Sequence, residues 1–366
     1  MKKRYFLGIL FFYTVAVFYL AATTPISPHE AKILYTSHNL VSALMQWGLM
    51  LLPSDFLGLR IFFIFFGFLS IGFFYLLSQR HFPKAEDGYL ATTIFMLLPG
   101  ILTASILANV AIIVLPLVLL FVLFYEKGYF IPLPLIMLAL FFIHEASVIF
   151  FIALLFYGSV YRDKKLTITS AAFLIAFVFL SKGIEIGGRP TGHFIEIFGL
   201  YAAVFSPLLF FYFFYAMYRI LLREKKNLLW YISFTALAFS LLLSIRQRIY
   251  ITDFAPYVML SIISMLDVFN RSVRVRLPEF QKRYKTGFKI VLFSLLVSTF
   301  VILFNQPLFN MAKEPEKHFA KRIYLPYLLA NRLKSEGKNC YDEIYRRERY
   351  QLRYYKLLPC SMEPIK

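Results

Sequence analysis

The sequence predicts an all-α polytopic membrane protein, and three observations point to this fold class. Of the 366 residues, 60% are hydrophobic and only 16% are charged, whereas a soluble domain averages roughly 25% charged residues. Apolar runs long enough to cross a bilayer, about 17–25 residues each, recur along the chain. Basic residues gather in the short loops on one side of these runs, as they do in cytoplasmic loops. A soluble fold is therefore excluded.

The apolar runs predict about eleven transmembrane helices. They fall at 5–22, 57–79, 88–106, 108–125, 129–143, 146–161, 166–182, 195–219, 228–245, 250–269 and 289–305. The runs at 129–143 and 146–161 are short and could instead form one long bent span. We divide the chain into a transmembrane domain, 1–305, and a small exported carboxyl-terminal tail, 306–366.

The distribution of Lys and Arg predicts the orientation of the chain. With the amino terminus in the cytoplasm, the cytoplasmic loops hold most of the basic residues, including a dense run between 271 and 289. The opposite loops hold only Lys32, Arg60, Lys182, Arg189, Arg246 and Arg248. This topology signal accounts for much of the net charge of +19, so we expect no nucleic-acid partner. A cleaved signal peptide is an alternative for the first run, but the further runs favour an uncleaved helix.

Both cysteines of the chain, Cys340 and Cys360, lie in the tail that this topology places outside the membrane. An oxidising compartment and a spacing of about 20 residues suit a disulfide worth about 3 kcal/mol on the chain-entropy model. Two unrelated thiols are the alternative.

The first outer loop, about 23–56, is long enough to carry structure. Its apolar residues form one stripe at helical spacing, and its polar residues recur on the opposite face, which predicts an amphipathic helix lying in the interface and ending near Pro53. The stripe comprises Ile33, Leu34, Val41, Leu44, Met45 and Leu51, and the polar face Lys32, Thr36, Asn39 and Gln46.

Glu30 stands at the start of this loop helix, in the segment Ile26-Ser27-Pro28-His29-Glu30-Ala31-Lys32. Ser27 as N-cap, Pro28 at the first helical position and Glu30 at the third form a capping box, which alone could explain the carboxylate. Its place at the rim of an apolar protein, with basic residues on the same side, equally favours a catalytic role. The two roles are compatible.

Several basic residues on the outer side are candidates for binding an anionic lipid headgroup. Arg60 opens the second span, Arg189 follows two glycines, and Arg246 and Arg248 precede Tyr250 in a tight turn. The planar fork of arginine chelates phosphate oxygens. Snorkelling at the rim is the alternative for any one of them.

His144 and Glu145 lie between two apolar runs, where ionisable groups are costly and often functional. They could line a substrate cavity or cap a broken helix pair. No pair of residues has metal-ligand spacing such as H-x-x-x-H or C-x-x-C, so we expect no metal and no cofactor.

The layout resembles the GT-C glycosyltransferases, in the branch of protein O-mannosyltransferases and the aminoarabinose transferase of lipid A. The likeness covers about 5–270. It includes the acidic motif after the first span, Leu57-Gly58-Leu59-Arg60, Leu98-Pro99-Gly100 with Ser105-Ile106-Leu107-Ala108-Asn109, and the stretch Ser244–Tyr257.

The resemblance implies transfer of a sugar from a polyprenyl phosphate to an acceptor at the outer face, with inversion. It assigns Glu30 as general base, Arg246, Arg248 and Tyr250 as phosphate-binding residues, and Arg60 as the family's arginine of the second span. The chain has His29 where the family shows Asp, and Asn109 where it often shows a second acid.

The sequence therefore predicts a glycosyltransferase of a bacterial inner membrane that decorates a cell-envelope glycan, a lipid or a protein. Its expected partners are a polyprenyl-phosphate sugar and membrane lipid. The candidate site comprises Glu30 as base and, for substrate, His29, Arg60, Asn109, His144, Glu145, Arg189, Arg246, Arg248 and Tyr250. The alternatives are an O-antigen-type polymerase or ligase, and a non-catalytic transporter or assembly subunit with a decayed transferase fold.

Overall fold

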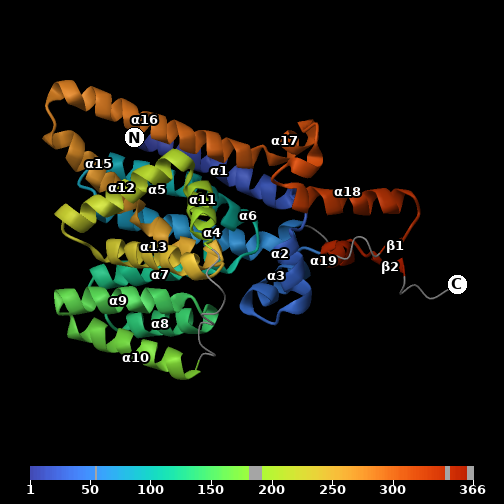
Figure 1. Ribbon diagram of the computed structural model, residues 1–366, viewed down its shortest axis with the longest axis horizontal. Coiled ribbons are helices and arrows are strands. Elements are labelled where there is room, and N and C mark those ends of the chain that lie inside the picture. Colours follow the sequence, from blue (N-terminus) through green and yellow to red (C-terminus); the bar gives the residue numbers. More distant parts are fainter. Residues whose placement is uncertain (54–55, 181–191, 343–346, 361–366) are drawn as a thin grey trace. The chain divides into compact units, whose positions relative to one another are not determined.

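The computed structural model describes residues 1–53, 56–180, 192–342 and 347–360 (Figure 1). The chain forms two compact units. The first comprises Met1–Phe12, Phe66–Ala104 and Val110–Thr299, and the second Tyr13–Phe65, Ser105–Asn109 and Phe300–Lys366. Helices α1 (Lys3–Thr23), α4 (Phe56–His81), α6 (Pro99–Ile106) and α16 (Pro278–Leu303) contribute residues to both.

Each predicted apolar run coincides with one helix or with consecutive helices. Besides α1, α4 and α16, these are α5 (Ala85–Leu97), α6 (Pro99–Ile106), α7 (Val110–Glu126), α8 (Pro132–Ile143), α9 (Ser147–Tyr161), α10 (Lys164–Leu180), α11 (Phe194–Phe205), α12 (Pro207–Arg223), α13 (Leu228–Arg246), α14 (Ile251–Val258), the 3-10 turn η1 (Met259–Ser261) and α15 (Ile262–Val275). The all-α polytopic membrane fold is confirmed.

Five described segments are long and apolar enough to cross a membrane unaided, or seven if each of two bent pairs counts as one span. The helices at α7, α8 and α9 are apolar but shorter. The total of eleven crossings and the direction of the termini stay predictions.

A proline follows the break in each bent pair. Leu98 has an extended backbone because a residue before proline is pushed out of the helical region, and α5 and α6 meet at 59° around it. Ser206 precedes Pro207 with φ of 85°, and the bend between α11 and α12 is 106°.

The first unit has a core of buried aromatic side chains. Helix α9 packs against α10 and α13, and α14 packs against α7 and α13. Phe150 of α9 stacks on Tyr257 of α14, and both are fully buried.

The first outer loop, in the second unit, forms two helices where the apolar stripe indicated one. These are α2 (Pro28–Thr36) and α3 (Leu40–Leu51). Asn39, assigned to the polar face of a continuous helix, is extended, and its side chain accepts a hydrogen bond from Ser42 N. Asparagine favours such caps over helix interiors, so the chain breaks between Ser37 and Asn39.

The described part of the tail also belongs to the second unit. It contains α17 (Asn305–Met311), η2 (Pro315–Lys317), α18 (Lys321–Ser335) and α19 (Arg349–Tyr354), and a parallel pair of short strands, β1 (Cys340–Tyr341) and β2 (Leu358–Pro359). Helix α19 lies beside α2 and α18 (Figure 1).

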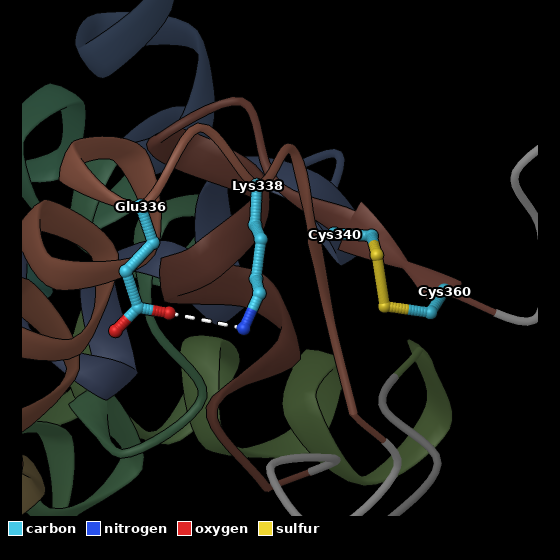
Figure 2. The surroundings of a disulfide bond; sticks show 4 residues. All are labelled: Glu336, Lys338, Cys340 and Cys360. Atoms are coloured by element: carbon cyan, nitrogen blue, oxygen red, sulfur yellow. Dashed lines mark hydrogen bonds and ion pairs between the residues drawn. A yellow bond between two sulfur atoms is a disulfide. The ribbon is translucent and has the colours of Figure 1, made fainter.

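A disulfide joins Cys340 and Cys360, as the sequence predicted. Figure 2 shows this bond next to the ion pair between Glu336 and Lys338, whose Oε2 and Nζ atoms lie 3.0 Å apart. The disulfide closes a loop that contains α19. The tail segment that contains α19 and packs on α2 is therefore held at both ends by the disulfide.

Candidate functional site

The start of α2 is built as the sequence predicted. Ser27 is the N-cap and its hydroxyl accepts a hydrogen bond from Glu30 N at 3.2 Å, while the Glu30 carboxylate accepts one from Ser27 N at 2.8 Å. Pro28 occupies the first helical turn. The capping box satisfies backbone donors that a helix start otherwise leaves unpaired and fixes where the Glu30 side chain begins.

Arg60 lies on α4 close to the point where Gly58 of that helix packs against Gly48 of α3. A Cβ atom on Gly48 of α3 would lie 2.0 Å from the carbonyl oxygen of Gly58 in α4, so only glycine permits this approach. Arg60 lies two residues after Gly58 on α4 and is fully buried. Glycine at 58, part of the Leu-Gly-Leu-Arg motif, thus positions the arginine.

Arg60 donates all five of its N–H groups within the protein. Nε and Nη2 bind the two oxygens of Glu30, each at 2.9 Å. The remaining three bind the carbonyl oxygens of Ala21 at 3.0 Å, Thr24 at 2.7 Å and Pro25 at 3.0 Å. These carbonyls lie at the end of α1, where a helix leaves acceptors unpaired and favours a cation.

The Glu30 carboxylate likewise accepts as many hydrogen bonds as its two oxygens can hold. Besides the bidentate contact with Arg60, Oε2 accepts from Ser27 N, and Oε1 accepts from Ala108 N at 2.8 Å. A carboxylate has about four acceptor positions, and all four are used. The side chain has no exposed surface. One buried ion pair thus joins the end of α1, the start of α2, the helix α4 and the segment between α6 and α7.

Burial by itself would raise the pKa of Glu30, but the opposing effects of Arg60 and the hydrogen bonds from Ala108 and Ser27 outweigh it and hold the pKa below its usual range. Glu30 is therefore ionised and a weak base. To take a proton from a substrate hydroxyl it would have to release one of its four hydrogen bonds. Its assignment as general base stays a prediction that this arrangement does not favour.

The geometry does not favour the phosphate-binding role predicted for Arg60. An arginine at the rim of the second span suggested snorkelling or a lipid phosphate, yet the guanidinium is 0% exposed and has no N–H left for a phosphate. Its neighbours on the loop differ. His29 is exposed one residue before Glu30, and Asn109 is half-buried beside Ala108.

The arginine pair of the sequence lies in the first unit at the turn between α13 and α14. Arg246 ends α13 and is exposed, and Tyr250, the N-cap of α14, is 78% exposed. Arg248 Nη2 binds Glu196 Oε1 of α11 at 2.8 Å, and both side chains are open to solvent. These three predicted residues share one turn, and their polar groups are accessible.

His144 also lies in the first unit, at the break between α8 and α9. Its Nε2 atom is 3.4 Å from Oδ1 of Asp253 in α14, while Glu145 is exposed. One turn further on, the Ser147 hydroxyl and the Tyr257 hydroxyl are 3.2 Å apart. His144 and Glu145 therefore lie at the break between α8 and α9, and His144 and Ser147 contact α14 there.

Arg189 lies outside the described residues. Within the described ranges, no three His, Cys, Asp or Glu side chains are grouped to hold a metal ion.

Sequence reasoning missed two parts of the second unit. Ala108 N reaches Glu30 across 78 residues, and only the resemblance drew attention to that segment. Gln351 is buried in α19 and its amide donates to the carbonyl oxygens of Ile26, at 2.9 Å, and Arg322, at 3.0 Å. No pattern in the sequence marks it.

Comparisons with known proteins identify the fold. No protein-family model matches the chain, and no curated protein matches it by sequence. Two crystal structures of ArnT from Cupriavidus metallidurans, an aminoarabinose transferase of GT-C fold, match it in structure. The apo form has a TM-score of 0.57 and 12% identity over 96% of this chain and 74% of ArnT. The form bound to undecaprenyl phosphate has a TM-score of 0.57 and 11% identity over 97% and 76%. The fold is therefore GT-C-like.

Proposed function

We propose that this chain is a membrane glycosyltransferase that takes a sugar from a polyprenyl phosphate and passes it to an acceptor hydroxyl at the outer face of a bacterial inner membrane. One observation carries the proposal: the GT-C-like fold covers nearly the whole chain, and one of the matching ArnT structures is bound to undecaprenyl phosphate. In this topology the amino terminus lies inside and the tail outside.

The reaction requires a base for the acceptor and cations for the departing phosphate. We assign the base to His29, because it is exposed beside the saturated Glu30 and imidazole accepts protons near neutral pH. The ion pair of Glu30 with Arg60 then acts as a positioning device that holds the start of α2. This reverses the order of importance that the sequence suggested within the motif.

Arg246, Arg248 and Tyr250 are the proposed phosphate-binding residues. Arg246 forms no ion pair within the described residues, and the pair of Arg248 with Glu196 is exposed, so it contributes little and is easily exchanged for a ligand. Arginine forks can bind two phosphate oxygens at once.

The proposed step balances without a further reactant. The acceptor oxygen forms a bond to the anomeric carbon while its proton passes to His29. The bond from that carbon to the phosphate oxygen breaks from the opposite side, so the configuration inverts. The polyprenyl phosphate leaves with the electron pair and carries the added negative charge.

The experiment is to purify the full-length chain and measure co-purifying polyprenyl phosphate by lipid mass spectrometry. We expect enrichment over bulk phospholipid, and a loss of about tenfold in Arg246→Gln/Arg248→Gln, since two charge-assisted contacts are removed. Lys32→Gln, which removes another basic residue of the outer loops, is the matched control and should retain the lipid.

No enrichment in the unmodified chain would overturn the proposal. A chain that instead co-purifies with a protein partner and no such lipid would be the non-catalytic subunit.

A further inference from the structure

A large cavity lies within the second unit, against the start of α2. Its volume is about 990 Å³, the upper end of the range for small-ligand sites, about 300–1,000 Å³. Helices α18 and α19 and the η2 turn form its walls together with Pro28. Gln351 at its edge ties α19 both to Ile26, just before α2, and to Arg322 of α18. The cavity is thus held by hydrogen bonds between three segments.

Cations dominate the charged lining of this cavity. Lys321, Arg322, Arg332 and Arg347 line it, against the carboxylates Glu316 and Glu348. Arg332 is engaged with Glu336, with Nε and Oε1 3.0 Å apart, whereas the other three form no ion pair among the residues that the structure describes. The lining therefore carries cations, unpaired within the described part of the chain, that can bind an anion.

The rest of the lining suits a saccharide. Leucines of α18 and two prolines supply apolar surface on which the C–H face of a sugar ring can pack, and the carboxylates Glu316 and Glu348 can accept hydrogen bonds from sugar hydroxyls. Arginine in addition binds phosphate or carboxylate oxygens in pairs. A purely apolar lipid chain would offer no partner to the five charged lining side chains other than Arg332, which is paired with Glu336.

We propose that this cavity binds the acceptor, and that the acceptor is a saccharide bearing phosphate or carboxylate groups. This rests on the proposed function, and it adds the substrate class and the place where the acceptor docks. The next residue after Pro28 is His29, the proposed base. A saccharide in the cavity therefore lies next to the first turn of α2, which carries the proposed base.

The disulfide contributes to this site. Arg347, Glu348 and Gln351 all belong to the loop that Cys340 and Cys360 close, so oxidation holds one wall of the cavity against α18. Reduction would release that wall and weaken binding.

The test is calorimetric titration of the purified full-length chain with mannose 6-phosphate, and with mannose as the uncharged comparison. No donor is present, so the result is independent of whether the chain transfers sugar or retains polyprenyl phosphate. We expect saturable binding of the phosphate that weakens as salt rises, and a loss of about tenfold in Arg322→Gln/Arg347→Gln. Lys334→Gln removes an exposed cation of the same helix α18 outside the cavity and should bind like the unmodified chain.

Three outcomes would overturn the proposal. They are equal affinity for mannose and its phosphate, unchanged binding in Arg322→Gln/Arg347→Gln, and an equal loss in Lys334→Gln, which would indicate unspecific attraction by the basic tail. Both exchanged arginines are exposed, and a thermal unfolding curve for each variant separates loss of the site from loss of the fold. Dithiothreitol should lower the affinity of the unmodified chain in the same assay.

Discussion

Two charged regions of the second unit use their hydrogen-bonding capacity in opposite ways. At the start of α2, Glu30 and Arg60 are fully buried and every donor and acceptor that they carry is taken by the protein. A few residues away, the cavity of the tail exposes Lys321, Arg322 and Arg347 without ion-pair partners among the described residues.

The contrast shows which charges are available to a ligand. A buried ion pair whose hydrogen bonds are complete gains nothing from substrate, and breaking it leaves a costly unpaired charge. Exposed cations contribute little to the stability of the fold, so any favourable free energy that they provide comes from binding a ligand. We therefore propose that Glu30, the most unusual charge in the sequence, is part of the scaffold, and that the exposed cations of the tail are the better ligand candidates.

The largest expected effect is on the buried pair. Arg60→Met removes one partner and leaves the Glu30 carboxylate uncompensated, which we expect to destabilise the second unit by about 3–5 kcal/mol. Urea unfolding of the purified chain, followed by the fluorescence of Trp47 in a Trp230→Phe background, measures this because the chain has 2 Trp and Trp47 lies in α3.

The matched control is Glu30→Leu/Arg60→Met, which removes both charges. Replacing a whole buried ion pair by apolar residues is often neutral, so the double variant should be more stable than Arg60→Met alone. A double variant as unstable as the single one would mean that the hydrogen bonds to Ala108 and the α1 carbonyls, and not charge compensation, hold this turn together.

The second effect concerns the tail. Cys340→Ser/Cys360→Ser opens a loop of 20 residues and should destabilise the tail by about 3 kcal/mol on the chain-entropy model. Limited proteolysis should then cut the segment around α19 faster, with little change in the first unit. Equal cleavage in the oxidised and variant chains would show that the contacts of α19 with α2 and α18 hold it without the disulfide.

The smallest effect of the three is the response to pH. Because the folded-state pKa of Glu30 is lowered by its partners despite its burial, its contribution to the free energy of unfolding is complete above the ordinary glutamate pKa, about 4.3. It is lost as pH falls through the lower folded-state value. Unfolding curves between pH 7 and pH 3 should show this acid-side loss, and the double variant Glu30→Leu/Arg60→Met should show less of it.

The parts that sequence could predict are those set by local pattern. The apolar runs predicted the helices, the Ser-x-x-Glu spacing predicted the capping box, and the two cysteines of the tail predicted the disulfide. The partner of Glu30 could not be found in this way, because Arg60 lies 30 residues away and Ala108 lies 78 residues away. Only the fold decides which helix ends meet.

Asn39 and Gln351 illustrate two further limits. The polar-face spacing of Asn39 fitted a continuous helix, but its preference for capping prevailed and split the loop helix in two. Gln351 sits in a polar tail with no periodicity, and its role depends on two carbonyl oxygens, at Ile26 and Arg322, that no sequence motif specifies.

The central claim is that His29 takes the proton while Glu30 holds the site in place, and the pH profile of sugar transfer tests it most directly. The assay supplies a polyprenyl-phosphate sugar and a phosphorylated saccharide to the full-length chain and to His29→Asn. The account predicts a rate that falls on the acid side within pH 5–8, where imidazole side chains titrate, and a loss of about 10²–10⁴-fold in His29→Asn. A rate that stays level down to about pH 5 and survives in His29→Asn would contradict it and would favour a carboxylate base, such as Glu30 with its lowered pKa.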